Sequence, residues 1–573
     1  MRTQKAEPGK TSISQQVLLG NYGLERYTTT FQRGTERASL LLNYGHQESR
    51  GAANHNQSRK DFVNFVGDFT PNSKQTVTTY FGFTNSFDQR YGELDTSQWR
   101  REDYSGNTNY IKNDAHSRVV SVRAGFGHTY QFNEHFSNST TLYGYGAITD
   151  ASSAGGWTDK DPINFGLRST FNARFNIGEV VLSGISGVES QHQRAQTIGY
   201  GMAANPFNPG GYNRISSVTS NLVTRTAANS LFSEWTLGFP DDFSITAGIG
   251  WSELKLRLTN RLAGVLAATA NANTPNEFTK DYGGMWSPHL AVNKVFNENV
   301  SAYASWSRGF KAPVTSYFYI PYVAGAPATG LVNPNLVPER GDQFEIGSKG
   351  NLWNNRIGYE LAAFRTTFSN KMTTIAVPLN NDPATATTAY SYVANGGRQV
   401  HTGVEFAVRA TVVKSASGFF REVAPFANFT YIDGKYEDYR FMRFRVAPNN
   451  TKDSTVDYSG KQVAGLPPVV FNAGVDVLTA PGIYFNAYYM HRDAVYLTGD
   501  NLVRAEGFGL LNAKLGFRRS LGVHFDLDAS VGAVNLGGVQ YYQMIFINQL
   551  PDAYVAAPRN TQWFGGITLK YNF

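Results

Sequence analysis

Two segments of the chain combine aromatic side chains with glycine and proline, a composition that suits a ligand-binding loop. Thr315–Tyr322 reads TSYFYIPY, and Asn205–Arg214 reads NPFNPGGYNR. Aromatic rings can stack on a ligand, and arginine can hold an anion through charge-assisted hydrogen bonds. The candidate contact residues are Tyr317, Tyr319, Tyr322, Phe207, Tyr212 and Arg214. The alternative is that the same rings pack their own loops or stand at a membrane surface.

The residue patterns that carry covalent catalysis do not occur in the sequence. There is no nucleophile elbow, no phosphate-binding loop ending in Gly-Lys-Ser/Thr, and no His-Glu-x-x-His. Cysteine is absent, which excludes thiolate metal sites and cysteine nucleophiles. We therefore expect a protein that is not an enzyme and that holds no metal and no cofactor.

The elements that must position the binding loops are β-strands with strict two-residue alternation. In Val523–Val531, VHFDLDASV, the odd-numbered residues are apolar and the even-numbered residues are polar. The same alternation runs through Leu511–Arg518, Ser244–Trp251 and Val469–Val477, and through the last segment, Gly566–Phe573. Such a pattern places one set of side chains on each face of a sheet.

The ten histidines are scattered along the chain. His401 and His524 fall on the polar phase of predicted strands, and Asp526 and Asp528 alternate beside His524. Two neighbouring carboxylates could imitate an acid–base pair. A polar face that lines a lumen explains these positions more simply, so we expect all four side chains to point into it.

Composition favours a membrane β-barrel. Charged residues are only 17% of the chain, aromatic residues are 14%, and mean hydropathy is −0.34. In a barrel only alternate residues face lipid, so the average stays polar. The most apolar stretch, Leu262–Ala272, is far shorter than the roughly 20 residues of a spanning helix. The net charge of +7 is spread out, so we expect no nucleic-acid partner.

The connections between predicted strands alternate between short and long, which is typical of an outer-membrane barrel with short periplasmic turns and long extracellular loops. The short turns are predicted at Gln32–Thr35, Pro71–Lys74, Asn133–His135, Asn176–Glu179, Pro240–Asp242, Asn297–Asn299, Leu352–Asn355, Thr479–Gly482 and Ser520–Gly522. The long loops are predicted at Gly45–Arg59, Ser86–Ser117, Thr149–Ile163, Gln191–Ala228, Asn260–Gly284, Pro313–Arg340, Pro378–Arg398, Gly434–Leu466, Arg492–Gly507 and Leu536–Thr561.

Counting back from Phe573 predicts one closed antiparallel barrel of about 22 strands, whose first strand is Thr11–Leu19. An even count places both termini in the periplasm. A soluble β-sandwich array or propeller is the alternative, but it would show a repeat of roughly 40–50 residues. No such repeat is present.

Four segments in one order carry a resemblance to a known family. Ser307–Pro313 reads SRGFKAP, Asn333–Glu339 reads NPNLVPE, Gly341–Gly350 reads GDQFEIGSKG, and Asn395–Val408 reads NGGRQVHTGVEFAV. This order resembles the barrel of the TonB-dependent receptors, and the resemblance runs from about Thr11 to the end of the chain. The family-motif positions are Gly309, Phe310, Ala312, Pro313, Asn333, Pro334, Pro338, Glu339, Glu345 and Gly347.

The motif residues have a structural interpretation first. Proline cannot donate to a strand ladder, so the three motif prolines indicate a loop. We expect Glu339 and Glu345 to anchor that loop by hydrogen bonds. At the chain end, Tyr571 and Phe573 resemble the signal that the barrel assembly machinery reads, although they could also be an ordinary apolar edge pattern.

Part of the family pattern is not found in this sequence. The N-terminal plug and its TonB-contact segment are missing, and Met1–Lys10 has no apolar signal region. We expect residues 1–10 to be a remnant of the plug-to-barrel linker and residues 11–573 to form the barrel. A truncated product or a plug encoded elsewhere would explain the pattern.

The resemblance implies TonB-dependent uptake of a scarce nutrient through the outer membrane, and we expect that nutrient to be a ferric siderophore bound at the extracellular loops. Iron would then arrive only as chelated substrate, and the TonB complex would act through a plug. The alternatives are a passive porin or adhesin, a plug-less fragment without function, and a barrel enzyme, for which the sequence offers no catalytic set.

Overall fold

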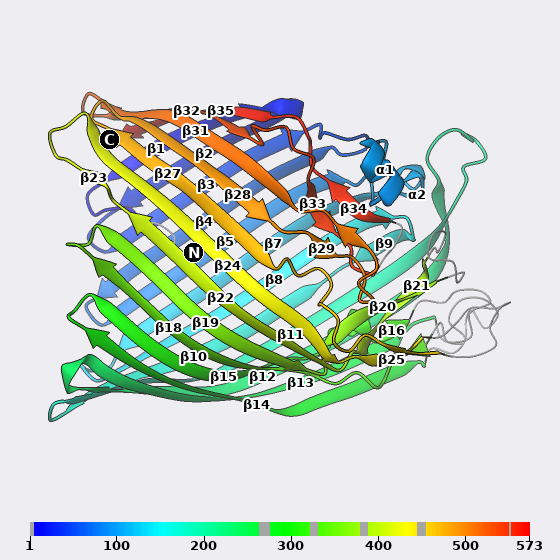
Figure 1. Cartoon of the computed structure of the whole chain (residues 1–573), viewed down its shortest axis with the longest axis horizontal. Coiled ribbons are helices and arrows are strands. Elements are labelled where there is room, and N and C mark those ends of the chain that lie inside the picture. The colour runs from blue at the N-terminus through cyan, green and yellow to red at the C-terminus, as the bar shows by residue number, and fades with distance from the viewer. Residues whose placement is uncertain (1–4, 263–274, 321–330, 379–387, 444–453, 549–551) are drawn as a thin grey trace.

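The computed structural model describes residues 5–262, 275–320, 331–378, 388–443, 454–548 and 552–573. Its main sheet has 24 strands, and without the short additions β9 and β23 a closed antiparallel wall of 22 remains (Figure 1). The wall strands are β1 (Thr11–Gly20), β2 (Leu24–Gly34), β3 (Ala38–Ser49), β4 (Ser58–Asn72), β5 (Gln75–Gln89), β7 (His116–Gln131), β8 (Phe136–Ser153), β10 (Ile163–Ile177), β11 (Val180–Ala203), β12 (Arg214–Phe239), β13 (Phe243–Asn260), β14 (Glu277–Phe296), β15 (Val300–Lys311), β18 (Glu339–Leu352), β19 (Ile357–Ser369), β22 (Arg398–Ala410), β24 (Phe420–Asp438), β27 (Val469–Thr479), β28 (Ile483–Arg492), β31 (Phe508–Leu521), β32 (Phe525–Val534) and β35 (Gln562–Asn572).

The remaining elements are short and lie mostly at the loop end of the barrel, at the right of Figure 1. They are α1 (Thr96–Arg101), α2 (Thr108–Lys112), η1 (Asn21–Gly23), η2 (Pro240–Asp242), η3 (Thr315–Tyr317), β6 (Leu94–Asp95), β9 (Gly156–Lys160), β16 (Tyr319–Ile320), β17 (Leu331–Val332), β20 (Met372–Pro378), β21 (Thr388–Asn395), β23 (Val413–Lys414), β25 (Arg440–Arg443), β26 (Ser454–Asp457), β29 (Val495–Tyr496), β30 (Arg504–Ala505), β33 (Tyr542–Ile545) and β34 (Asp552–Ala556). Within the described ranges no helix is long and apolar enough to cross a membrane.

The barrel closes by pairing its first and last strands. β1 is antiparallel to β35, with Ser12 opposite Asn572 and Gly20 opposite Phe564. The backbone N–H of Phe573 donates to the carbonyl of Thr11 at 3.0 Å. Since both edges are paired, the wall leaves no free edge to aggregate.

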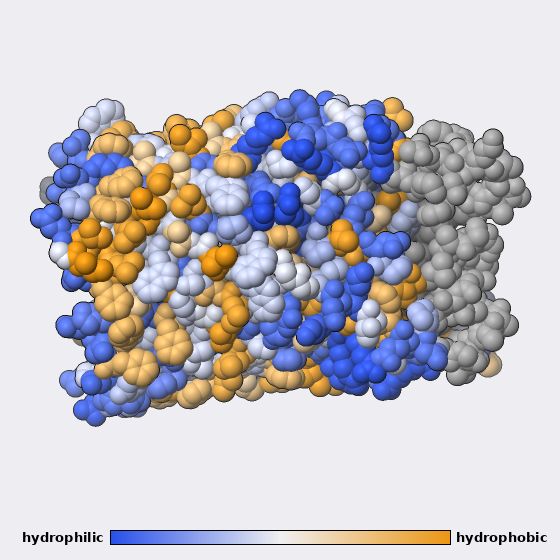
Figure 2. Space-filling model, turned by 90° about the horizontal axis from the view of Figure 1, so that it is seen from below, coloured by the Kyte–Doolittle hydropathy of each residue, from blue (hydrophilic) through white to orange (hydrophobic). Residues whose placement is uncertain are grey.

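The predicted alternation has the expected outcome on the two faces of the wall. Leu231 and Ile249 are both 51% exposed and Ile567 is 56% exposed, all on the outer face. Residues of the other phase point inward, such as Thr236 of β12 and Thr246 of β13, whose hydroxyls lie 2.8 Å apart. Figure 2, seen from below in Figure 1, shows apolar residues concentrated toward the turn end and hydrophilic residues gathering toward the loop end.

One predicted connection needs correction, and two connections were missed. Gln191–Ala228 is not one long loop, because β11 continues to Ala203 and β12 begins at Arg214. These strand ends stand above the apolar belt, where polar residues suit both faces and the alternation fades. The short connection at Asn21–Gly23 and the turn at 411–419 were not predicted, and both are needed for 22 strands.

Candidate functional site

Three loops at the mouth of the barrel fold together into what we call the loop lobe, defined as residues 90–115, 493–507, 536–548 and 552–561. Its described core contains Leu94, Leu497 and Ala553, all fully buried. The ring of Trp99 stacks on that of Tyr554, with centroids 4.9 Å apart and planes 1° apart. β6, β34 and β33 form a small sheet within it. The lobe is therefore a packed unit and not three independent loops.

One edge of the loop lobe concentrates negative charge. Partial burial raises the pKa of the Asp552 carboxyl above its usual range, and the nearby Asp95 and Glu93 raise it further. Burial also raises the pKa of Tyr91 to about 12. The hydroxyl of Tyr91 donates to the carbonyl of Ala556 at 2.9 Å, which joins the first and third loops of the lobe.

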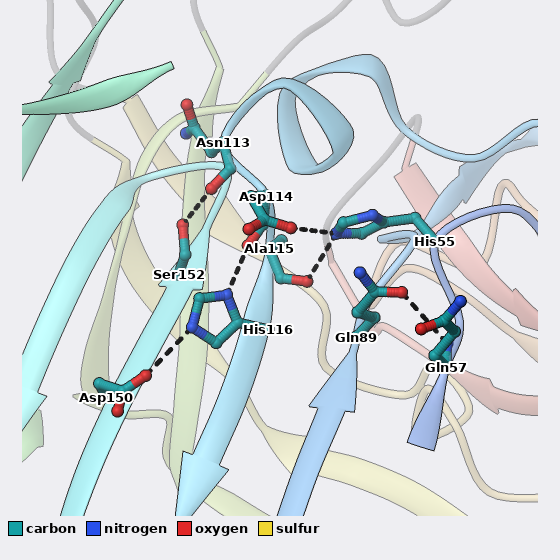
Figure 3. A network of polar contacts seen from close by, with 9 residues as sticks. All are labelled: His55, Gln57, Gln89, Asn113, Asp114, Ala115, His116, Asp150 and Ser152. Carbon is teal, nitrogen blue, oxygen red and sulfur yellow. Dashed lines mark hydrogen bonds and ion pairs between the residues drawn. The ribbon is translucent and has the colours of Figure 1, made fainter. Parts of the chain in front are cut away.

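A buried polar network ties the neighbouring loops to the lobe (Figure 3). One ring nitrogen of His116 lies 2.6 Å from the carbonyl of Asp114, and the other lies 3.1 Å from the Asp150 carboxylate. His55, from the loop between β3 and β4, reaches both the carbonyl of Ala115 at 3.0 Å and the Asp114 carboxylate at 3.3 Å. Sequence reasoning missed these histidines because His55 bonds to a different loop and the Asp150 partner of His116 lies on another strand, β8.

The predicted contact residues of the loop between β11 and β12 divide into two kinds. Phe207 is 88% exposed at the loop tip, and Arg214 is exposed at the start of β12. Tyr212 is also exposed, at 49%, but one edge of its ring packs against His55, with ring centroids 5.7 Å apart. The backbone N–H of Asn213 donates to the carbonyl of Lys112 at 2.6 Å, so this loop rests on the lobe.

The predicted aromatic segment after β15 contains a core residue. Phe318 is fully buried and packs with Leu256, Met285 and Leu336, while Tyr317 lies at the edge of this cluster. Tyr319 pairs through its backbone with Val332, and its side chain lies outside the described part. Tyr322 lies outside the described residues altogether.

The two predicted sets do not meet in the described structure. No contact joins Tyr317 to Phe207, Tyr212 or Arg214 among the described residues, and the two loops lie on different strand pairs. Phe318 packs inward because its segment must cover the apolar ends of β13 and β14. The sequence pattern of four aromatic residues does not by itself distinguish rings that face a ligand from rings that form a core.

The first half of the family motif builds the loop after β15. Gly309 and Phe310 end that strand, Ala312 and the buried Pro313 follow, and Phe310 and Ala312 pack against the Phe318 cluster. The Asn333 side chain donates to the carbonyl of Val393 at 2.9 Å, and the carbonyl of Pro334 accepts from Lys280 at 3.0 Å. Pro338 then leads into β18.

Glu339 anchors the return into the sheet. Its carboxylate, 5% exposed, accepts from the ammonium of Lys371 at 2.5 Å and from the backbone N–H of Met372 at 3.2 Å. Both partners belong to the loop between β19 and β22. A buried carboxylate with two donors holds the neighbouring loops together at their base.

Glu345 behaves differently from the expectation that it anchors the loop. It stands in β18 on the lumen face, where it accepts from the Tyr303 hydroxyl at 2.7 Å and from the Gln343 amide at 2.9 Å. Gly347 lies opposite Tyr303. A Cβ on Gly347 would stand 2.5 Å from the Tyr303 ring. The glycine therefore makes room for the ring, and the ring delivers its hydroxyl to the glutamate.

The lumen wall near the turn end carries carboxylates without close cations. Glu345, Glu360 and Glu405 line one cavity of about 390 Å³ together with Tyr303. In the described part of the chain no lysine or arginine nitrogen lies within 4.0 Å of these three carboxylates. Lys349 faces Glu360 across the strand pair but makes no ion pair with it.

The lumen wall near the loop end has a cation with an unused donor. Arg492 shares the even-numbered face of β28, opposite to the exposed Phe485 and Tyr489, so it points inward. Its guanidinium lies 5.4 Å from the ring centre of Tyr542, a lobe residue. The Nε of Arg492 and the hydroxyl of Tyr542 are both buried without a hydrogen-bond partner among the described residues.

The C-terminal residues stand on the outer face at the turn end. Phe573 is 70% exposed, and its ring lies edge-on to that of Tyr571, with centroids 4.9 Å apart. The predicted lumen position of His524 is wrong. His524 lies in the turn before β32, bonds to the carbonyl of Asn572 at 2.8 Å and stacks on Tyr571. His401, Asp526 and Asp528 do share the inward face of their strands.

The described residues contain no group of three or more His, Cys, Asp or Glu side chains that could hold a metal ion. Asp528 is instead paired with Arg518 at 2.7 Å and accepts from the Tyr484 hydroxyl at 2.8 Å. The two aspartates of β32 thus belong to a hydrogen-bonded lumen face.

Among curated proteins, none matches this chain in sequence. Solved structures match it along its whole length. The ferric citrate transporter FecA in the unliganded form gives a TM-score of 0.77 at 15% identity, over 100% of this chain and 80% of that chain. The siderophore receptor PiuA from Acinetobacter baumannii gives 0.76 at 14%, over 99% and 82%. The ferric yersiniabactin uptake receptor FyuA from Yersinia pestis gives 0.71 at 13%, over 100% and 81%.

Identities this low establish the fold, and the family rests on a separate match. The family profile described as "TonB dependent receptor-like, beta-barrel" matches residues 20–536. The family and the similar structures are receptors and transporters, as expected from the lack of a catalytic set. The closed wall, the motif loop after β15 and this match agree: the chain belongs to the family of TonB-dependent receptor β-barrels of the Gram-negative outer membrane.

Proposed function

We propose that this barrel takes up a ferric siderophore across the outer membrane in an energy-coupled step. The ligand would bind beneath the extracellular loops as an anionic iron chelate, so iron enters as substrate. Family membership supports nutrient uptake. The named ligands of the similar structures, ferric citrate and ferric yersiniabactin, support a chelate.

The observation that carries the proposal is Arg492 beside Tyr542. A buried polar group without a hydrogen bond costs roughly 1–3 kcal/mol, so such groups persist where a ligand or water satisfies them. Arg492 points into the lumen below the loop lobe and has no carboxylate within 4.0 Å among the described residues. A carboxylate or catecholate oxygen of a chelate could accept from its guanidinium and use the Tyr542 ring as a stacking surface.

The acidic cavity at the other end of the lumen supports a second partner. Glu345, Glu360 and Glu405 would be neutralised by a plug with a basic face, whether it precedes this chain or comes from a separate polypeptide. Such a plug would close the wide lumen of a 22-strand barrel. The TonB complex would act on that plug and not on the wall.

Ligand binding is tested with the purified chain and two defined probes, ferric citrate and a ferric tris-catecholate, by quenching of tryptophan fluorescence. We expect Arg492→Gln to weaken binding of one probe by about tenfold, the loss of one charge-assisted contact. Arg504→Gln is the matched control, since Arg504 lies 5.8 Å from the Tyr496 ring on the exposed side of the loop lobe.

Uptake is tested by growth of an iron-starved strain on the same chelates. Growth that requires both the receptor gene and TonB supports coupled transport. Growth that continues without TonB would indicate a passive pore. Growth that is unchanged when the receptor gene is deleted would refute the siderophore assignment. Equal binding by Arg492→Gln and the unaltered chain would remove Arg492 from the ligand site and leave the family membership untouched.

A further inference from the structure

Three arginines stand in one row across adjacent strands near the loop end of the wall. Arg194 of β11 is directly opposite Arg225 of β12, and Arg225 is directly opposite Arg257 of β13. Side chains directly opposite each other have Cβ atoms about 5 Å apart, and like charges there are destabilising. A row that breaks this rule needs a compensating anion.

The row faces away from the lumen. Arg225 shares the odd-numbered face of β12 with Leu231, and Arg257 shares the odd-numbered face of β13 with Ile249, both half exposed to the outside. The β12–β13 register runs without a shift between these positions. Leu256 and Leu258, on the opposite face of β13, are buried. A ligand in the lumen therefore cannot reach these guanidinium groups.

Nearby carboxylates compensate the row only in part. Glu277 is bonded to Arg257. Asp161 lies 3.8 Å from Arg194, too far for a hydrogen bond. Asp281 and Glu253 face the same side lower down, where Glu253 lies 3.6 Å from Lys255. In the described part of the chain Arg225 has no carboxylate within 4.0 Å, so the Arg194–Arg225 pair has free donors.

An apolar groove lies below the row, on the same strands and on their neighbours β10 and β14. It encloses about 710 Å³ and is lined by Phe171, Val188, Leu231, Ile249, Trp251 and Trp286. Ser186 and Ser233 form its floor and bond to each other at 2.7 Å, so they satisfy their own hydroxyls and leave an apolar channel. Between groove and row, Phe165 is 59% exposed and stacks on His192, as an aromatic residue does at a membrane interface.

The spacing of groove and row fits one lipid leaflet. Leu231 is six residues from Arg225 along β12, or about 20 Å at 3.3 Å per residue. A strand tilt of about 40° reduces this to roughly 15 Å of height, half of a hydrocarbon core about 30 Å thick. A headgroup at Arg225 would thus place an acyl chain in the groove.

We propose that the outer faces of β10 to β14 bind one phosphate-bearing lipid of the outer leaflet. Its phosphate bridges Arg194 and Arg225, and one acyl chain lies in the groove between Leu231 and Trp286. Arginine recognises phosphate through paired N–H donors, and two opposed guanidinium groups can share one phosphate. The site is independent of ligand uptake through the lumen.

The test uses the purified chain in detergent with dioleoylphosphatidic acid, and native mass spectrometry measures the retained lipid. We expect Arg225→Gln, and equally Arg194→Gln, to lower retention by about tenfold. The control is Arg118→Gln, because Arg118 is an exposed arginine at the loop end of β7 whose cross-strand neighbours are Phe87 and Asp150. Circular dichroism confirms that each variant is folded.

Two further experiments test the phosphate group and the acyl chain of the lipid separately. Dioleoylglycerol, which lacks the phosphate, should be retained weakly, and millimolar inorganic phosphate should not displace the phosphatidic acid. A brominated acyl chain should quench tryptophan fluorescence less in Trp251→Phe and Trp286→Phe than in the unaltered chain. Three results would each overturn the proposal: equal lipid retention by Arg225→Gln and the unaltered chain, displacement of phosphatidic acid by inorganic phosphate, or equal quenching in the unaltered chain and both tryptophan variants.

Discussion

At the scale of single residues, the Glu-x-Gly motif of β18 has a steric explanation. Tyr303 of β15 crosses the face of Gly347 and donates its hydroxyl to Glu345. The wall repeats this device elsewhere, since a Cβ on Gly516 would meet Tyr484 and one on Gly532 would meet Phe564. Aromatic side chains that cover cross-strand glycines recover the packing area that the glycines lack.

Gly347→Ala should therefore destabilise the barrel by about 1–3 kcal/mol, because the new methyl group would overlap the Tyr303 ring. Thermal unfolding in detergent measures the change. Gly309→Ala, in the same motif, should leave the unfolding stability nearly unchanged, because a Cβ on Gly309 would have no atom within 4 Å. If the steric account is right, adding Tyr303→Ala to Gly347→Ala will cost less than the sum of the single substitutions.

At the scale of elements, the loop lobe makes the mouth of the barrel cooperative. Its core residues come from three loops, the first of which is hundreds of residues from the other two, and Tyr91, Trp99 and Tyr554 connect the first loop to the third. Hydrogen bonds extend the assembly to the loop before β27, where Lys461 donates to the carbonyl of Asp500 at 2.8 Å. These loops should therefore open together.

Leu94→Ala tests this cooperativity. Removing a fully buried leucine should cost about 2–5 kcal/mol, and the loss should fall on the lobe alone. Hydrogen exchange should accelerate in β6, β33 and β34 while the wall strands keep their protection. Leu502→Ala is the control, because Leu502 is 75% exposed in the same lobe, and it should leave hydrogen exchange in these strands unchanged. Exchange that rises only around residue 94 would contradict a cooperative lobe.

Asp552 should make the lobe sensitive to pH. Its pKa is raised in the folded state, so its contribution to stability is present below the ordinary value of about 3.9 and is lost as pH rises through the folded pKa. We expect protection of β34 to increase as pH falls from 7 toward 4. Asp552→Asn should stabilise the lobe at pH 7 by about 0.5 kcal/mol, a small value because water still reaches this carboxylate.

Asp103 of the same lobe provides the control for this pH effect. Its pKa is lowered by hydrogen bonds from Ser105, so Asp103→Asn should act in the opposite direction at pH 7. If protection of β34 in the unaltered chain instead decreases as the pH is lowered from 7 toward 4, the charge on Asp552 does not destabilise the lobe.

At the scale of the whole molecule, the wall is completed only when β35 meets β1. Phe573 contributes one backbone hydrogen bond to this seam and leaves its ring exposed on the outer face. A side chain with so little protein contact adds little to the stability of the finished barrel. Its expected role is in assembly.

Phe573→Ser should accordingly reduce the amount of barrel inserted into the outer membrane several-fold and change the unfolding stability of inserted barrel by less than about 1 kcal/mol. Cell fractionation and thermal unfolding measure the two quantities. Phe525→Ser is the matched control, since Phe525 is also exposed at the turn end and packs on Tyr571. Equal insertion defects in both variants would mean that the terminal position has no special role.

The alternation of apolar and polar residues was enough to predict the wall, because a strand's two faces are set by a period of two within the strand itself. It was sufficient in Ser244–Trp251 and Leu511–Arg518, both of which lie within strands. It failed between Gln191 and Ala228, where the strands rise above the apolar belt and both faces are polar. Proline placement and spacing likewise predicted the loop after β15.

Contacts between residues that are far apart in the sequence were decided only by the tertiary structure. Phe318 is a core residue and not a free ring, Tyr212 rests on His55, and Arg492 meets Tyr542. The arginine row exists because the registers of β11, β12 and β13 place residues 194, 225 and 257 side by side. Registers and loop packing depend on partners far away in sequence, and a period-two pattern carries no information about them.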